Sequence, residues 1–285
     1  MILKDNLPLL ISFSGGRTSA FMAKFLIESS DLDHKEKVVV YANTGKEFEH
    51  TLEFINECDK RWNLNVVWLD SVVNHEKGKG TDFKVVDFES ASRNGEPFEE
   101  VIKKYGIPNK QFPHCTRELK QVPIKKYMKS LGYSEWHTAV GIRADEPHRI
   151  NRGSDTNFIN PFFPLADMIK VDERFIREWW EKQDFDLELK DYQSNCDLCW
   201  KKSKRKRLTL LEEDERIGDW WKRMEDLYGE NYRFDQREGV NVIDLIQESK
   251  RPFRKAIDKH DLRKSQTNLF DPIMDTEYDC FCKNS

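Results

Sequence analysis

The sequence lacks several features that would place the chain in a special class of protein. No run of about 18 consecutive apolar residues occurs, so no membrane-spanning helix is predicted. The first residues, MILKDNLPLLISFSGG, have a short apolar run and no cleavage site, so they are not a signal peptide and we expect a cytoplasmic protein. A large excess of positive or negative charge is also missing, because the net charge is only −4. The overall charge balance therefore indicates no polyanionic partner.

Cysteine is scarce as well. Six cysteines in 285 residues are too few for a disulfide scaffold, and a reducing compartment favours metal-binding or catalytic roles for them. No internal repeat or low-complexity tract is present. The length is large for one simple domain and small for two large ones, so we expect a main α/β domain with a smaller appendage.

Short apolar runs alternate with helical patterns in the first part of the chain. Residues 9–13 (LLISF), 37–42 (KVVVYA) and 65–69 (NVVWL) read as buried strands, with helical spacing of apolar residues between them. This order predicts right-handed βαβ units in an open, mainly parallel twisted sheet with flanking helices over residues 1–190. From residue 191 the composition shifts towards Cys, Lys, Arg and Trp, which predicts a smaller helical, cysteine-containing module over residues 191–285.

A glycine-rich loop, Ser14-Gly15-Gly16-Arg17-Thr18-Ser19, joins the first predicted strand to the first helix. Glycines let the backbone approach an anion closely, and the free N–H groups and dipole of a helix N-terminus favour phosphate. The loop has neither the Gly-x4-Gly-Lys spacing nor the Gly-x-Gly-x2-Gly spacing of the commonest nucleotide motifs. The alternative is a strand–turn–helix junction in which the glycines serve geometry alone.

Four segments together resemble one known family. SFSGGRTSA is similar to the PP-loop of ATP pyrophosphatases and of the reductases that act on phosphoadenosine phosphosulfate (PAPS) or adenosine phosphosulfate (APS). VVVYANTGKEFEHTLEFI, FPHCTRELKQVPIKKY and AVGIRADEPHR resemble later segments of PAPS reductases, in the same order, within residues 9 to about 200. The resemblance implies the PAPS reductase-like family of the PP-loop (adenine nucleotide α-hydrolase) superfamily, with PAPS, APS or ATP as nucleotide and Mg²⁺ if it is ATP.

The resemblance carries over to individual positions of this chain. The implied nucleotide- and phosphate-binding residues are Ser12, Ser14, Gly15, Gly16, Arg17, Thr18, Ser19, Asn43, Thr44, Gly45, Arg117, Lys120, Gly141, Arg143, His148 and Arg149. Two of them depart from the family pattern, since Thr18 and Asn43 stand where the relatives often have Asp. Both departures remove negative charge that could help to hold Mg²⁺ beside a triphosphate.

The cysteines form two close pairs, Cys196-x2-Cys199 and Cys280-x-Cys282, and Cys115 lies in the segment that resembles PAPS reductases. Cysteine thiolates at this spacing can hold one metal or one iron–sulfur cluster. By the resemblance we expect a 4Fe–4S cluster on Cys115, Cys196, Cys199 and Cys282, with Zn²⁺ or no metal as alternatives. Cys58 has no partner in the sequence and is expected in the core.

Three functions stay open at this point. The first is a PAPS reductase-like enzyme in which the thiol of Cys280 or Cys282 attacks the sulfur of a sulfonucleotide and a thiol reductant completes turnover. The second is an ATP-dependent sulfurtransferase that thiolates tRNA or DNA through an adenylated intermediate and takes sulfur from a donor. The third, motivated by Thr18 and Asn43, is a non-catalytic nucleotide-sensing module.

A basic run follows directly on the first cysteine pair. It is read either as a solvated helix face or as an anion-binding surface, for a phosphosulfate or for a nucleic-acid backbone. Its members are Lys201, Lys202, Lys204, Arg205, Lys206 and Arg207. The sequence does not determine the oligomeric state, and a homodimer is one arrangement that it allows.

Overall fold

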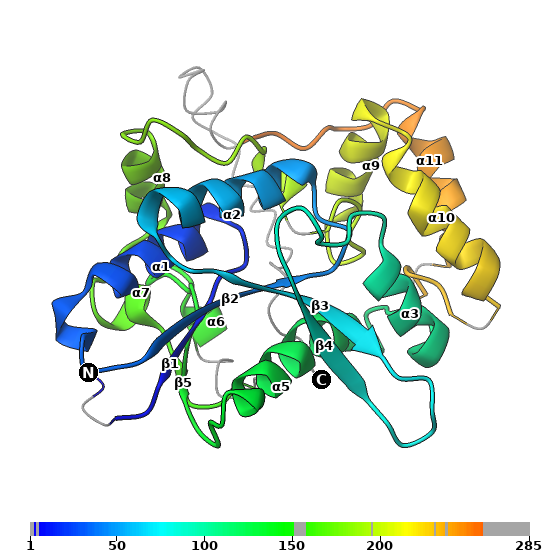
Figure 1. Ribbon diagram of the computed structural model, residues 1–285. Coiled ribbons are helices and arrows are strands. Elements are labelled where there is room, and N and C mark those ends of the chain that lie inside the picture. Colours follow the sequence, from blue (N-terminus) through cyan, green and yellow to red (C-terminus); the bar gives the residue numbers. More distant parts are fainter. Residues whose placement is uncertain are drawn as a thin grey trace, which may run out of the picture.

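The computed structural model describes residues 3, 6–150, 158–194, 196–230, 232–236 and 239–258. Within these residues six strands form one sheet in the order β4-β3-β2-β1-β5-β6 (Figure 1). The strands are β1 (Leu9–Ser12), β2 (Lys37–Asn43), β3 (Val67–Val73), β4 (Thr81–Val86), β5 (His137–Ala139) and β6 (Pro161–Phe162). All neighbours pair in parallel except β4, which runs antiparallel to β3 at the edge. The predicted open, mainly parallel sheet is confirmed.

The central strand β1 is buried along its whole length, which explains its continuous apolar sequence. Leu9 pairs with Lys37 of β2 on one side and with His137 of β5 on the other. Successive residues of β1 face opposite sides of the sheet. Leu9 and Ile11 therefore belong to one core cluster and Leu10 to another.

Helices cover both faces of the sheet. The first face is covered by α1 (Arg17–Glu28), α2 (Glu49–Trp62) and α8 (Glu173–Trp180), and the opposite face by α5 (Val122–Ser130) (Figure 1). The tryptophan pair on α8 is part of the core, since the ring centroid of Trp179 lies 5.0 Å from that of Phe21 and the ring centroid of Trp180 lies 5.0 Å from that of Phe54. The short helical elements are η1 (Ser30–Leu32), α4 (His114–Thr116), η2 (Arg117–Gln121), α6 (Pro147–Ile150), α7 (Pro164–Asp167) and η4 (Asp191–Gln193).

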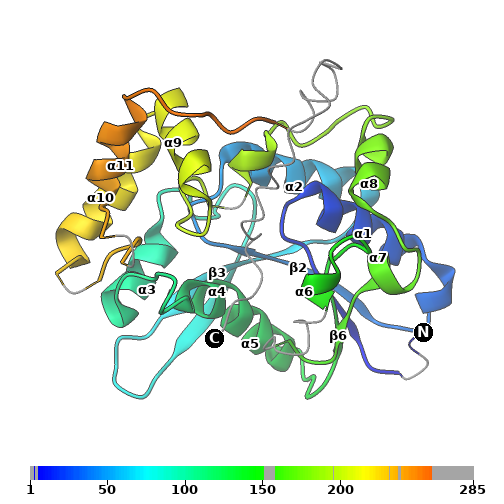
Figure 2. The ribbon, with the colours of Figure 1, turned by 180° about the vertical axis from the view of Figure 1, so that it is seen from behind.

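A second core lies at the end of the molecule where α9 (Lys204–Glu213), α10 (Ile217–Tyr228) and α11 (Val242–Ser249) are grouped (Figure 2). Phe98 of α3 (Glu96–Tyr105) packs there, with ring centroids 5.3 Å from Trp220 and 5.6 Å from Trp221. This core therefore joins the helices after residue 190 to a helix from the segment that we assigned to the nucleotide-binding domain. No helix among the described residues is long and apolar enough to cross a membrane.

Candidate functional site

The glycine-rich loop lies at the carboxyl end of β1, and its two glycines serve different purposes. Gly15 has φ +80°, and a Cβ placed on it would lie 2.6 Å from Thr51 Cγ2 and 2.9 Å from Ile55 Cδ1 of α2. A Cβ on Gly16 would meet no atom within 4 Å. Gly15 thus lets the loop turn against α2, whereas Gly16 borders open space at the start of α1.

Hydrogen bonds among the loop's own residues hold its shape. The backbone N–H of Ser14 donates to Ser19 Oγ at 3.2 Å, the two serine hydroxyl oxygens are 3.0 Å apart, and Ser19 Oγ donates to the carbonyl of Gly16 at 2.9 Å. Among the described residues no side chain caps the N-terminus of α1, and its first turn carries no acidic residue. The first N–H groups of the helix are therefore available to an anion.

The strand order places this loop where ligands bind in open α/β sheets. The chain runs from β1 outwards through β2 and β3 on one side, whereas β5 lies on the other side of β1. The crevice between the carboxyl ends of β1 and β5 is therefore the topological switch point. Gly141, after β5, reaches into it so closely that a Cβ there would lie 3.3 Å from Ser19 Cα.

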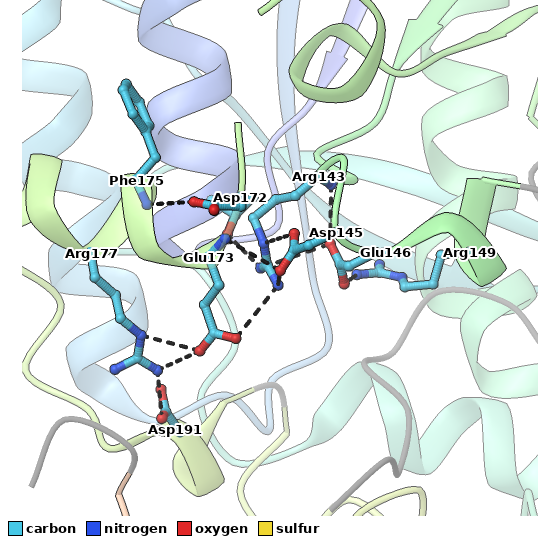
Figure 3. Close-up of polar contacts among 10 residues, drawn as sticks. Arg143, Asp145, Glu146, Arg149, Asp172, Glu173, Phe175, Arg177 and Asp191 are labelled. Atoms are coloured by element: carbon cyan, nitrogen blue, oxygen red, sulfur yellow. Dashed lines mark hydrogen bonds and ion pairs between the residues drawn. The ribbon is translucent and has the colours of Figure 1, made fainter. Parts of the chain in front are cut away.

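Arg143 approaches the loop from the β5 side, with Nη1 donating to Thr18 Oγ1 at 3.4 Å. Carboxylates surround its guanidinium group, with Asp145 at 2.9 Å, Glu146 at 3.7 Å and Glu173 of α8 at 3.9 Å (Figure 3). Burial lowers the pKa of Arg143, but the hydrogen bond to Asp145 and the nearby charges outweigh burial and keep that pKa above its ordinary value. Arg143 is thus a charged group beside the phosphate loop, already balanced by acids.

The ion pairs continue away from Arg143 in both directions. Arg149 of α6 binds Glu146 at 2.5 Å, and Arg177 of α8 binds both Glu173 at 2.7 Å and Asp191 at 2.8 Å (Figure 3). His148, also on α6, is exposed. Of the cluster predicted after β5, Arg143 is the member whose side chain bonds to the phosphate loop in the described residues.

Arg17 has a different role from the one that its position suggests. Its guanidinium group binds Asp186 at 2.7 Å and the carbonyl of Leu189 at 3.3 Å, and it also donates to the carbonyl of Leu187. The indole N–H of Trp180 donates to the Arg17 carbonyl at 3.0 Å. The side chain of Arg17 therefore fastens the segment after α8 onto the first turn of α1.

Asn43, at the end of β2, is fully buried in a network that links β2 to β3. Its Nδ2 donates to Asp70 Oδ1 and to the carbonyl of Ser92, both at 2.8 Å, and its Oδ1 accepts from Gly45 N–H at 3.1 Å. The other oxygen of Asp70 accepts from the hydroxyl of Ser92 at 2.7 Å. The negative charge missing at position 43 is thus present on Asp70 of β3, where it is satisfied by hydrogen bonds.

Three of the four predicted cluster ligands come together. Cys115, Cys196 and Cys199 are buried and line one small cavity, whose walls also include Thr44, Lys120, Phe98, Leu119, Trp200 and Trp221. Thr44 Oγ1 lies 3.3 Å from Cys196 Sγ, so the cavity adjoins the turn after β2. The residues that the structure describes contain no group of three or more His, Cys, Asp or Glu side chains arranged to hold a metal ion. Cys280 and Cys282 lie outside the described residues.

Comparison with known proteins identifies the family. The sequence model of the phosphoadenosine phosphosulfate reductase domain matches residues 8–90. The uncharacterised nin region protein ORF290 of Escherichia phage lambda is 34% identical over 201 residues, which cover 69% of this chain and 67% of the phage protein. The chain belongs to the PAPS reductase-like family of the PP-loop superfamily.

Three further proteins are similar to this chain at lower sequence identity. Two uncharacterised proteins of Methanocaldococcus jannaschii are 30% and 26% identical over 174 and 145 residues, covering 59% and 50% of this chain. The matched regions span only 35% and 24% of those two proteins. The crystal structure of PAPS reductase from Candida auris in its phosphate complex matches with 14% identity and a TM-score of 0.38, over 61% of this chain and 71% of that one.

Two further residues in the segment of Cys115, both on η2, differ in their exposure. The Arg117 side chain is 52% exposed and binds Glu118 at 2.7 Å. Lys120 is buried on the wall of the cysteine cavity, with Nζ 3.7 Å from Glu47 Oε1. Lys120 therefore lines the cysteine cavity with its ammonium group near Glu47, whereas Arg117 carries its charge at the surface.

The basic run after Cys199 is only in part a solvated helix face. Lys202 and Arg207 are buried, and burial lowers the pKa of Lys202. Lys201 donates to Thr116 Oγ1 at 2.9 Å, Lys204 binds Glu248 at 2.8 Å, and Arg207 forms an ion pair with Asp235. The interpretation as a solvated face is therefore wrong for Lys202 and Arg207, whereas the other members of the run are partly exposed.

Sequence reasoning missed residues that connect the two parts of the site. Asp70 directly follows the apolar run of the third strand, in register with Asn43, and the rule that ligands gather at carboxyl strand ends could have found it. Lys46, Glu47 and Asp197 carry no comparable signal, because each is a single charged residue in a charged chain. Their partners are distant in sequence.

Proposed function

We propose that this PAPS reductase-like protein is an enzyme that binds an adenine nucleotide with its phosphates on residues 14–19. The observation that carries the proposal is the uncapped start of α1 at the switch point, bordered by the open side of Gly16 and by Arg143. Membership of the family supports an adenine nucleotide as the ligand.

In this proposal the helix N-terminus and the hydroxyl groups of Ser14 and Ser19 provide hydrogen-bond donors, and Arg143 provides the cation. A phosphate entering the crevice replaces carboxylate partners of Arg143, because one guanidinium group has a limited number of donors. The released carboxylate of Asp145 is exposed and is hydrated at little cost, whereas the buried Glu146 keeps Arg149 as its partner. The result is an exchange of ion pairs rather than the burial of new charge.

The cysteine cavity supports sulfur chemistry close to the nucleotide. Cys115, Cys196 and Cys199 offer the donor type that an iron–sulfur cluster needs, inside apolar walls, and we propose Cys282 as the fourth ligand of a 4Fe–4S cluster. Zn²⁺ is the alternative occupant of the same thiols. A bound cluster would supply a redox-active, sulfur-rich centre at this edge of the sheet.

We propose thiol attack on a sulfonucleotide as the reaction. With Cys282 as the cluster ligand, the thiolate of Cys280 attacks the sulfur of PAPS or APS, and the exchange of these two roles is the alternative. An S–S bond forms, and the S–O bond breaks with its electron pair leaving on the nucleotide phosphate. A thiol reductant then attacks the cysteine sulfur and releases sulfite, and the second thiol of the reductant resolves the mixed disulfide. The phosphate loop and Arg143 stabilise the negative charge on the departing nucleotide.

The test is sulfite release from PAPS and from APS by protein prepared without oxygen, with a dithiol reductant present. Release that disappears in Cys280→Ser or Cys282→Ser while the iron content is retained supports the reaction and locates the nucleophile, whereas loss of release together with iron identifies the cluster ligand. Pyrophosphate release from ATP that requires added tRNA or DNA would instead indicate the sulfurtransferase. Tight nucleotide binding without turnover of any of these substrates would indicate the non-catalytic nucleotide-sensing module. Iron and zinc contents of the same preparation decide between cluster and zinc.

A further inference from the structure

Asp197 stands between the two cysteines of the Cys196–Cys199 pair and bonds to two other parts of the chain. Its backbone N–H donates to the carbonyl of Lys46 at 2.7 Å, and its Oδ2 lies 2.8 Å from Lys46 Nζ. Its Oδ1 accepts from the indole N–H of Trp221 on α10 at 2.7 Å. The side chains of Lys46 and Asp197 are only 11% and 13% exposed, so this ion pair is largely withdrawn from water.

Lys46 belongs to the turn after β2, two residues beyond Thr44. Its Nζ also lies 5.2 Å from the centre of the Trp220 ring, within the range of a cation–π contact. That ring is pressed against the backbone of Gly95, where a Cβ would be 2.5 Å away. The turn, the loop between the two cysteines and the start of α10 therefore fit together closely around one charged pair.

The two loops also meet through their backbones. Glu47 forms an antiparallel bridge with Cys196, and the Thr44 hydroxyl lies 3.3 Å from Cys196 Sγ. A charged group in this setting is strongly destabilised when its partner is removed, because it is left poorly solvated and unpaired. Loss of either Lys46 or Asp197 should therefore release the loop between the cysteines from the turn.

We propose that Asp197 is a positioning residue, which holds Cys196 and Cys199 at the nucleotide-binding edge of the sheet through its ion pair with Lys46. The inference rests on the proposed function for its purpose, since it explains how thiols from the second half of the chain are kept beside the turn after β2. Its geometry rests on the contacts of Asp197 alone.

The experiment measures the rate at which iodoacetamide alkylates each cysteine of the full-length, metal-free and reduced protein, with peptides resolved by mass spectrometry. In Asp197→Asn, which keeps an acceptor for Trp221 but loses the charge, alkylation of Cys196 and Cys199 should rise at least about tenfold. Tenfold corresponds to about 1.4 kcal/mol, close to the low end for a hydrogen bond to a charged group. Cys58, which is fully buried in the other core, is the internal control and should not change.

Two further variants separate positioning from general loosening. Lys46→Met keeps an apolar stem over Trp220 and should raise alkylation as much as Asp197→Asn does, and the double variant should add little to either, because both changes break one interaction. Lys46→Arg keeps the cation and should restore rates near those of the wild type. The matched control is Asp191→Asn, which breaks the ion pair with Arg177 at the same 2.8 Å separation and should leave the Cys196 and Cys199 rates unchanged.

The proposal is overturned if Asp197→Asn leaves the two rates unchanged, if Cys58 reacts in parallel with them, or if Asp191→Asn has the same effect. Additive effects of the two single changes would also contradict it. If Asp197→Asn does not fold, Lys46→Met and Lys46→Arg carry the comparison. The alkylation needs neither nucleotide nor turnover, so an absence of sulfite release would refute the proposed function and leave this result standing.

Discussion

Replacing Gly15 by alanine tests whether the phosphate loop has the conformation described. The added Cβ would sit 2.6 Å from Thr51 Cγ2 and 2.9 Å from Ile55 Cδ1, on a residue with φ +80°. The left-handed conformation costs a non-glycine residue about 1–2 kcal/mol, and overpacking a filled site costs about 1–3 kcal/mol. We therefore expect the free energy of unfolding to fall by about 2–5 kcal/mol, measured by urea denaturation.

Gly16→Ala is the informative counterpart. A Cβ on Gly16 meets no atom within 4 Å and its φ is −97°, so the free energy of unfolding should fall by less than about 1 kcal/mol. The same Cβ projects into the space where we place the nucleotide's phosphates, so affinity for adenine nucleotides, measured by calorimetry, should drop at least about tenfold, or about 1.4 kcal/mol. Gly80→Ala is the matched control, since its Cβ also meets no atom within 4 Å but lies in the loop between β3 and β4. It should change neither quantity.

The reasoning would be refuted in either of two ways. If Gly15→Ala unfolds within about 0.5 kcal/mol of the wild type, the size of an ordinary surface substitution, the loop does not have the left-handed turn against α2. If Gly16→Ala binds nucleotide as tightly as Gly80→Ala does, the phosphates do not lie at the open side of Gly16, even if the fold is right.

Four other single substitutions test the roles assigned above. Asn43→Asp places a second carboxylate against Asp70 and should lower the free energy of unfolding by about 2–4 kcal/mol at pH 7. Adding Asp70→Asn should restore part of this loss, and an unchanged denaturation midpoint in Asn43→Asp would contradict the buried network. Arg143→Met should weaken nucleotide binding at least about tenfold and also lower the free energy of unfolding, because the buried Glu146 loses one of its two cationic partners. Arg17→Met should lower the free energy of unfolding by about 1–2 kcal/mol and change the Kd less than about threefold, and the reverse pattern of nucleotide affinities would exchange their roles. Burial raises the pKa of Cys58 above its ordinary value, so its thiol ionises only in the unfolded state as the pH passes about 9. The stabilisation by the buried neutral thiol is therefore present below this pH and is lost above it. In Cys58→Ala the free energy of unfolding, measured from denaturation curves between pH 8 and 10, should fall less steeply with pH.

The main α/β layout could be predicted because each of its units is local in the sequence. A buried strand, a turn and an amphipathic helix are specified within about 20 consecutive residues, and their order implies parallel pairing. The phosphate loop belongs to the same class, since its glycines, its serines and the helix that follows are adjacent. Its contacts could also be anticipated in part, because Ser14 and Ser19 bond to each other across one turn.

The contacts of individual side chains could not be predicted in the same way. Arg17 was expected to face phosphate from its place in the loop, yet it bonds to residues that follow α8. Asn43 was interpreted as a lost acid, yet it donates to an acid on the neighbouring strand. In both cases the partner is distant in sequence, and the choice among several polar partners depends on which of them remain unsatisfied once the chain is folded.

By itself, the sequence determined the first three strands, the glycine-rich loop between the first strand and its helix, and the type of chemistry that its cysteines can support, because these depend on neighbouring residues. Only the tertiary structure decided that β5 lies beside β1, which creates the switch point and brings Arg143 to Thr18. It also decided that Cys115, Cys196 and Cys199 line one cavity beside Thr44, and that Lys202 and Arg207 of the basic run are buried. The physical reason is that strand order and side-chain convergence follow from burying all the apolar faces at once, a condition that no local segment contains.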